Sequence, residues 1–145
     1  MLSWIRSPEE LESWTSRADH PLPATVFAEW HADPDVEGFV LVDDEPVGYG
    51  EVWADPQENE AELARIVVAP EARRRGLGRA LVTMLVEEAR GLGFQEIWLR
   101  VVPTNAAALA CYRSAGFQRA TPEEEERFNR GQPRAYAWMT LGEED

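Results

Sequence analysis

The sequence of 145 residues contains no lysine, only one cysteine and only two histidines. A single Cys111 excludes an internal disulfide and is typical of a reducing compartment. His20 and His31 are too few and too badly spaced for a metal site, so we expect none. No apolar run is long enough to cross a membrane, and the first residues become polar too early for a signal peptide. We therefore expect a cytoplasmic protein without a membrane partner.

Positive charge is also scarce, because fourteen arginines face 27 Asp and Glu residues and the formal net charge is −13. This charge repels a phosphate backbone, which argues against nucleic acid as the partner and mildly favours cationic ligands such as amines. The hydrophobic content of 44% includes six tryptophans, which is enough for a packed core. The length predicts one domain.

Apolar spacing and glycine and proline positions divide the chain into helices and strands. Two short helices are expected at 7–17 and 24–31, and the first begins with the capping pattern of Ser7, Pro8 and Glu10. Three strands are expected next, at 38–42, 47–54 and 63–68. They are followed by a helix at 76–90, a strand at 96–102, a helix at 105–115, and strands at 117–120 and 134–141. The segment 121–133 is interpreted as a mobile loop. Its acidic run at 123–126 is interpreted as a solvated face or a helix turn, with an acidic lip that attracts a basic acceptor as the alternative. This order indicates an α/β (α+β) fold.

The stretch EARRRGLGRALV, residues 71–82, places arginines and glycines between an expected strand and an expected helix. The first amides of a helix have no internal partner and carry partial positive charge, so they attract an anion. Gly76 and Gly78 would let a phosphate approach these amides. The Walker A and dinucleotide-binding patterns both fail here, since no Gly-Lys-Ser/Thr follows and the third glycine position is Leu81. The alternative is a solvated basic turn.

A second stretch, LRVVPTNAAALACYRSAGF at 99–117, sets Asn105, Ala108, Tyr112 and Gly116-Phe117 at fixed steps after a strand. The first stretch, taken together with the expected strand before it, has the pattern Ile66-x-Val68-x-Pro70-x-x-Arg73-x-x-Gly76-x-Gly78-x-x-Leu81. In this order and spacing the two resemble the acetyl-CoA signatures of the GNAT superfamily of N-acetyltransferases. The resemblance extends over residues 38–141.

The resemblance implies a central mixed, mostly antiparallel sheet flanked by helices, with acetyl-CoA as the cofactor. Backbone amides around 74–80 would hold the pyrophosphate, and two splayed strands would admit the pantetheine arm. The implied cofactor-binding residues are Ile66, Val67, Val68, Arg73, Arg74, Arg75, Gly76, Leu77, Gly78, Arg79, Ala80, Asn105, Ala108 and Tyr112. One acetyltransferase domain would fill 1–145, with acceptor-side helices at 1–37, the cofactor-binding core at 38–117 and C-terminal strands at 118–145.

Acetyl transfer to an amine needs a base for the amine, donors for the oxyanion and a proton for the leaving thiolate. Tyr112 matches the family's general acid by position; otherwise it is an ordinary buried tyrosine. Glu62 is the first candidate for the base. Glu51, on the adjacent strand, is the second, and could instead bind the ammonium of the acceptor. Otherwise each is a solvated edge carboxylate.

Two further expectations concern the surroundings of these residues. Glu62 is expected to share one strand face with Ala64, Ile66 and Val68, and a backbone amide near Ile66 or Val67 to serve the oxyanion. Cys111 is interpreted as a small core residue, with an acetyl-cysteine as the alternative. Trp30 and Trp53 are the tryptophans expected nearest the acceptor.

The sequence thus predicts an N-acetyltransferase that moves an acetyl group directly to a primary amine of a small molecule or peptide. The alternatives are a non-catalytic acyl-CoA-binding or regulatory module and a phosphate-binding interaction domain. A homodimer stays open.

Overall fold

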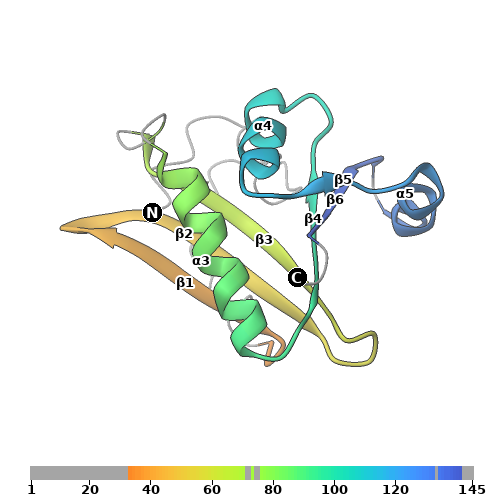
Figure 1. Cartoon of the computed structure of the whole chain (residues 1–145), viewed down its shortest axis with the longest axis horizontal. Coiled ribbons are helices and arrows are strands. Elements are labelled where there is room, and N and C mark those ends of the chain that lie inside the picture. The colour runs from red at the N-terminus through yellow and green to blue at the C-terminus, as the bar shows by residue number, and fades with distance from the viewer. Residues whose placement is uncertain (1–32, 71–72, 74–75, 133, 142–145) are drawn as a thin grey trace.

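The computed structural model describes residues 33–70, 73, 76–132 and 134–141. The helices expected at 7–17 and 24–31 lie outside these residues, as do the two histidines, Trp30, Arg74 and Arg75. The remaining elements form one sheet with three helices (Figure 1).

The sheet has six strands in the order β1-β2-β3-β4-β6-β5. The strands are β1 (Val36–Asp43), β2 (Glu45–Asp55), β3 (Glu60–Val68), β4 (Glu96–Val101), β5 (Gln118–Arg119) and β6 (Ala137–Leu141). Strands β3 and β4 pair in parallel, and the other neighbours pair antiparallel. The predicted mixed, mostly antiparallel sheet is confirmed.

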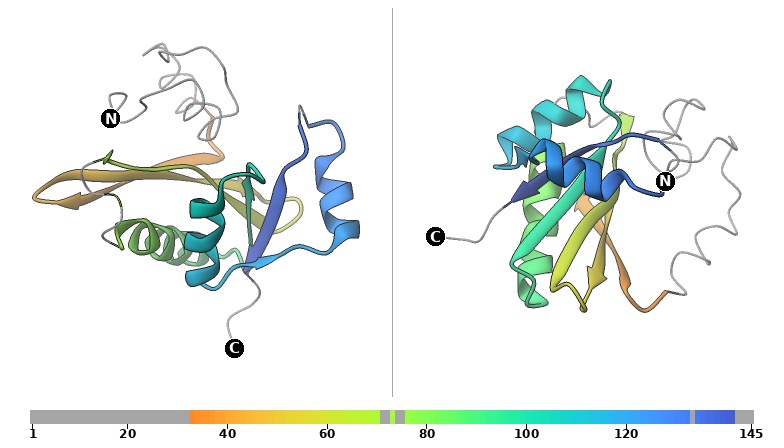
Figure 2. Two further views of the ribbon diagram at one scale, coloured as in Figure 1. Left: turned by 90° about the horizontal axis from the view of Figure 1, so that it is seen from above. Right: turned by 90° about the vertical axis from the view of Figure 1, so that its right-hand side faces the viewer.

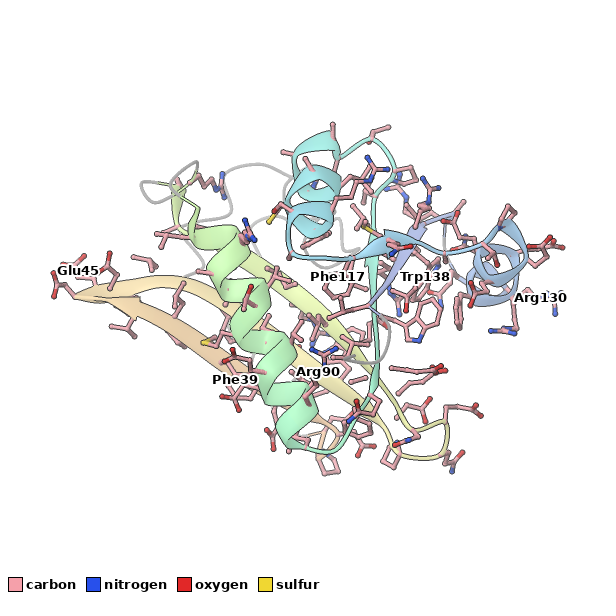
Figure 3. All side chains as sticks on the ribbon, viewed as in Figure 1. Phe39, Glu45, Arg90, Phe117, Arg130 and Trp138 are labelled. Carbon is pink, nitrogen blue, oxygen red and sulfur yellow. The ribbon has the colours of Figure 1, made fainter. Side chains whose placement is uncertain are left out.

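The helices divide between the two faces of the sheet. Helices α3 (Leu77–Gly91) and α4 (Ala106–Ser114) lie on one side of β1 to β3 (Figure 2). Helix α5 (Pro122–Asn129) packs Phe128 against Trp98 and Trp138 on the other face. Figure 3 labels one residue from the core of each face, Phe117 beside α4 and Trp138 toward α5. No helix in the described part of the chain is long and apolar enough to cross a membrane.

Alternation along the strands decides which residues form the main core. The fully buried Leu81 and Leu85 of α3 pack onto β2, β3 and β4, where Val52, Leu63 and Leu99 point to the same side. Helix and sheet approach closely at Gly50, because a Cβ there would lie 2.6 Å from Cδ1 of Leu85. The absence of a side chain at Gly50 therefore lets α3 pack directly onto β2.

The loop predicted at 121–133 is wrong for most of its length, since α5 occupies Pro122–Asn129. Thr121 caps this helix and forms a capping box with Glu124, and Pro122 starts it. This is the pattern of a helix start that Ser7, Pro8 and Glu10 display. The acidic run at 123–126 lies in the first turns of the helix, where negative charge is favoured by the helix dipole.

The prediction that Glu62 shares one face of its strand with Ile66 and Val68 is also wrong. A register shift between Tyr49 and Glu51 of β2 leaves an extra residue in β3, and Arg65 adopts a φ of 50° there. Such a bulge reverses the alternation that follows it. Ile66 and Val68 pack against the α3 core. Glu62 bonds Arg100, beside Trp98 and Trp138 on the opposite face.

Candidate active site

The site lies where β3 and β4 separate. Their parallel pairing runs from Glu60 opposite Glu96 to Leu63 opposite Leu99 and then ends. Beyond this point lies a cleft of about 980 Å³. Its walls are the ends of β3 and β4, the start of α3, and α4 with the turn that precedes it. Strand splaying of the kind expected from the family resemblance is therefore present.

The start of α3 forms one wall of the cleft and has the properties of an anion site. Gly76 stands at the N-cap position with a φ of 77°, and no side chain caps the helix. The first turn carries no acidic residue. Its free amides therefore present unopposed partial positive charge to a ligand. Arg79 also lines the cleft and adds a full positive charge.

Gly78 keeps the cleft open between α3 and α4. A Cβ at this position would lie 3.3 Å from Sγ of Cys111, which belongs to the opposite wall. Any larger side chain would therefore extend into the space between the two helices. This gives glycine a steric reason at a position where the φ angle does not require it.

Helix α4 supplies the second wall and the candidate acid. Asn105 caps the helix, and its Oδ1 accepts a hydrogen bond from the amide of Ala108 at 3.1 Å. Tyr112 lines the cleft one turn later, with its ring edge to face against Phe117 at 6.5 Å. Among the described residues, none forms a hydrogen bond with the Tyr112 hydroxyl. The hydroxyl is thus available to a ligand.

Burial alters the acidity of both titratable residues on this helix. Burial raises the pKa of Tyr112 well above its ordinary value of 10.0, and neighbouring Cys111 adds to the effect. Tyr112 therefore stays protonated over the physiological range and remains a proton donor. Burial also raises the pKa of the Cys111 thiol, against the opposing charge of Arg79. A protonated thiol is a poor nucleophile.

Glu51 is fully buried and bonded on three sides. Its carboxylate accepts hydrogen bonds from the Tyr49 hydroxyl at 2.5 Å, the Trp53 indole at 2.8 Å and Nη1 of Arg65 at 2.7 Å. Burial, followed by this hydrogen bond to Glu51, raises the pKa of Tyr49 far above its ordinary value. Glu51 does not line the cleft. It has the position of a structural carboxylate rather than a solvated edge residue.

Glu62 is also paired, but nearer to the cleft. Nε and Nη2 of Arg100 donate to its two oxygens at 2.7 and 2.9 Å. Arg100 itself lines the cleft, while Glu62 does not. The guanidinium reaches Oε1 of Gln132 at 2.9 Å through Nη1 and lies over the Trp138 ring at 4.7 Å. Glu62 is therefore held beside the cleft by a residue of its wall.

The structure brings most of the predicted cofactor residues together. The predicted residues that line the cleft are Ile66, Val67, Val68, Arg73, Gly76, Gly78, Arg79, Asn105, Ala108 and Tyr112. Leu77 and Ala80 lie in the first turn of α3 but are not among the residues that line the cleft. Arg74 and Arg75 fall outside the described residues. Sequence reasoning missed Arg100, whose signal was a lone charge in the apolar run IWLRVV.

Comparisons with known proteins agree with this geometry. The profile of the Acetyltransferase (GNAT) family matches residues 1–117. The chain is 48% identical over 63 residues to the "[Ribosomal protein bS18]-alanine N-acetyltransferase" of Escherichia coli K12, covering 43% of each protein. It is 34% identical over 87 residues to "Streptothricin acetyltransferase" of Streptomyces lavendulae, covering 59% of the chain and 46% of that protein.

A solved structure extends the similarity over nearly the whole chain. The crystal structure of the ribosomal-protein-S18-alanine N-acetyltransferase from Escherichia coli superposes with a TM-score of 0.65 at 26% identity, covering 95% of this chain and 88% of that one. The sequence matches, by contrast, span less than half the length of the two curated relatives, at 43% and 46%.

Proposed function

Because the chain belongs to the GNAT family of acetyltransferases, we propose that it transfers an acetyl group from acetyl-CoA to a primary amine. The observation that carries the proposal is the cleft between the separated ends of β3 and β4, with the uncapped start of α3 at one wall and Tyr112 at the other. An anion site and a proton donor in one cleft are what thioester transfer requires.

The residues present fit coenzyme A. The free amides of the first turn of α3 and Arg79 suit its pyrophosphate. Gly78 provides a space that a Cβ would fill. The unpaired stretch of β3 after Leu63 suits the extended arm, with Asn105 on the far wall. When bound, the cofactor supplies an acetyl thioester.

Tyr112 would give its proton to the departing sulfur. The amine nitrogen forms a bond to the acetyl carbon, the carbon–sulfur bond breaks, and the thiolate takes the Tyr112 proton. A backbone amide near Ile66 or Val67, just after the bulge in β3, would donate to the oxyanion. Cys111 takes no part, since its thiol stays protonated, so transfer is direct within a ternary complex.

Glu62 is the better of the two carboxylates for the amine proton. Glu51 is fully buried, accepts three hydrogen bonds and is absent from the cleft. The side chain of Glu62 is 17% exposed and adjoins Arg100 of the cleft wall. It would accept the proton directly or through a water. The alternative is that water alone removes the proton.

A panel of amines tests the function. The whole chain is incubated with acetyl-CoA, free thiol is followed by absorbance, and acetylated amine is measured by mass spectrometry. We expect thiol and acetylated amine to appear in equal amounts for at least one amine. A protein that binds coenzyme A but releases no thiol with any amine would instead be the non-catalytic acyl-CoA-binding module.

A further inference from the structure

Two ion pairs lie on the face of the sheet opposite α3. One joins Glu51 to Arg65 at 2.7 Å, and the other joins Glu62 to Arg100. The ring of Trp53 lies between the two guanidinium groups, at 4.7 Å from that of Arg65 and 5.9 Å from that of Arg100. Each carboxylate of this network thus has its own cation, and together the four charges cancel.

Arg100 belongs both to this face of the sheet and to the wall of the cleft. Tyr112 enters the cleft from α4, which lies on the α3 face, and packs against the core on that side. Arg100 lines the same cleft from β4, but its guanidinium lies among Glu62, Tyr136 and Trp138 on the opposite face. A thioester group is planar, and an amine adds to its carbonyl carbon from one of the two faces of that plane. With Tyr112 beside the sulfur on the α3 side, the side of Arg100 is the one left open to the attacking amine.

Arg100 has unused hydrogen-bond donors on this side of the sheet. A guanidinium carries five N–H groups. Three of them are used, two by Glu62 and one by Gln132. The other two donate to no acceptor among the described residues, and the side chain is 25% exposed. Each oxygen of Glu62 accepts one bond from Arg100 and keeps a second lone pair.

We propose that Arg100 binds a carbonyl or carboxylate oxygen next to the reacting amine, so that the acceptor is an α-amino carbonyl compound: an amino acid or a peptide N-terminus. The inference rests on the proposed acetyl transfer and names its substrate class. The amine faces the remaining lone pairs of Glu62, and the carbonyl oxygen faces the two remaining N–H groups of Arg100. The Glu62–Arg100 pair thereby binds both the amine and the carbonyl oxygen of the same acceptor.

A polyamine fits this face poorly. A chain with a net charge of −13 would attract polycations in general. At this face, however, the carboxylates of Glu51 and Glu62 are each neutralised by an arginine. The second ammonium group of a polyamine would be repelled by the positive charge of Arg100. Neither carboxylate would offset this repulsion, because each is already paired with an arginine.

The test compares two acceptors that differ only in the carbonyl group. Alaninamide and isopropylamine have the same branched amine, and a methyl group replaces the carboxamide in the second. We expect wild-type kcat/KM, expressed per free amine, to be roughly 10- to 100-fold higher for alaninamide, as a hydrogen bond to a charged donor predicts. Putrescine serves as the polyamine probe and should react no better than isopropylamine. A wild-type preference for putrescine or isopropylamine would overturn the inference.

Variants then assign the preference to Arg100. In Arg100→Gln the alaninamide advantage should fall to about 3-fold or less, mainly through KM, because intrinsic amine reactivity cancels in the ratio of the two acceptors. Gln132→Ala removes a neighbour that Arg100 bonds but leaves its free N–H groups, so the ratio should persist. An unchanged ratio in Arg100→Gln would contradict the proposal while leaving acetyl transfer intact.

Loss of Arg100 leaves Glu62 without its cation, so folding must be checked. The double variant Glu62→Gln with Arg100→Gln removes both charges and should show the same collapsed ratio, while coenzyme A affinity by calorimetry stays within about 3-fold of wild type. If the wild type acetylates none of these three amines but acetylates another amine of the panel, this inference fails and the proposed function stands. If it binds coenzyme A and acetylates no amine of the panel, both fail.

Discussion

Glu62 and Arg100 form a two-point ion pair across β3 and β4, with N–O distances of 2.7 and 2.9 Å. Glu62 is one residue before Leu63, the last residue of β3 that pairs with β4, and Arg100 is one residue after Leu99, its partner. The pair therefore joins the strands where they begin to separate. It also holds Glu62, the candidate general base, at the point where the cleft begins.

The first prediction concerns Glu62 as that base. Glu62→Gln keeps the shape and an oxygen for Arg100 but removes the proton acceptor. Its kcat/KM should be low near neutral pH and approach wild type as the pH rises toward the pKa of the amine, because free amine then needs no enzymic base. The measurement is a pH–rate profile of both proteins with one amine. A deficit that is the same at every pH would assign proton removal to water.

Glu51 should instead matter for stability. Glu51→Ala leaves the Tyr49 hydroxyl, the Trp53 indole and the Arg65 guanidinium without their shared acceptor. We expect the free energy of unfolding to fall by roughly 3 kcal/mol. Urea denaturation measures this, with Glu45→Ala at the exposed tip of the β1–β2 hairpin as the control (Figure 3). A folded variant of unchanged stability would show that the network contributes little.

Gly78 should control cofactor access. Gly78→Leu would place a side chain in the space between α3 and Cys111, where even a Cβ lies at 3.3 Å. Calorimetry should show coenzyme A affinity reduced by at least about 10-fold, with the unfolding temperature little changed. Gly91→Leu is the matched control, because a Cβ there meets nothing within 4 Å. Equal affinities in the two variants would place the cofactor elsewhere.

Glu60 should make stability depend on pH. Burial and the carboxyl group of Glu96, its partner across the strands, raise the pKa of Glu60 to about 7. A folded-state pKa above the unfolded value of 4.5 means that the native protein binds the proton more tightly. This stabilisation is complete below the unfolded pKa and is lost as the pH rises toward 7 and beyond.

Glu60→Gln mimics the protonated side chain and should remove this dependence. Relative to wild type, the variant should gain stability at about pH 8 compared with about pH 5, as measured by urea denaturation at both values. Glu37→Gln, on the exposed side of β1, is the control. The same difference between variant and wild type at both pH values would contradict the raised pKa.

Much of the fold followed from local signals in the sequence. The glycines at 76 and 78 and the apolar spacing after them marked α3, and Asn105 marked the start of α4. Helix α5 was expected as no more than a helix turn at the acidic run inside a loop, although Thr121, Pro122 and Glu124 carry a helix-start pattern. The error was one of interpretation, not of missing signal.

The site was harder to predict because it depends on tertiary register. The bulge at Arg65 places a non-glycine residue at positive φ, and nothing in the sequence marks it. It separates Glu62 from Ile66 and Val68, which alternation alone had put on one face. Similarly, Arg100 becomes the partner of Glu62 only through the parallel pairing of two strands far apart in sequence.

Tyr112→Phe tests the central claim most directly, because it removes one oxygen and keeps the ring. Coenzyme A affinity, measured by calorimetry, should stay within about 3-fold of wild type, since the cleft wall is preserved. Over the same pH range kcat should fall by roughly 10²- to 10⁴-fold and should not recover at high pH, because the defect lies in the leaving group. A Tyr112→Phe variant that binds coenzyme A and turns over near the wild-type rate would contradict the assignment of Tyr112 as the proton donor.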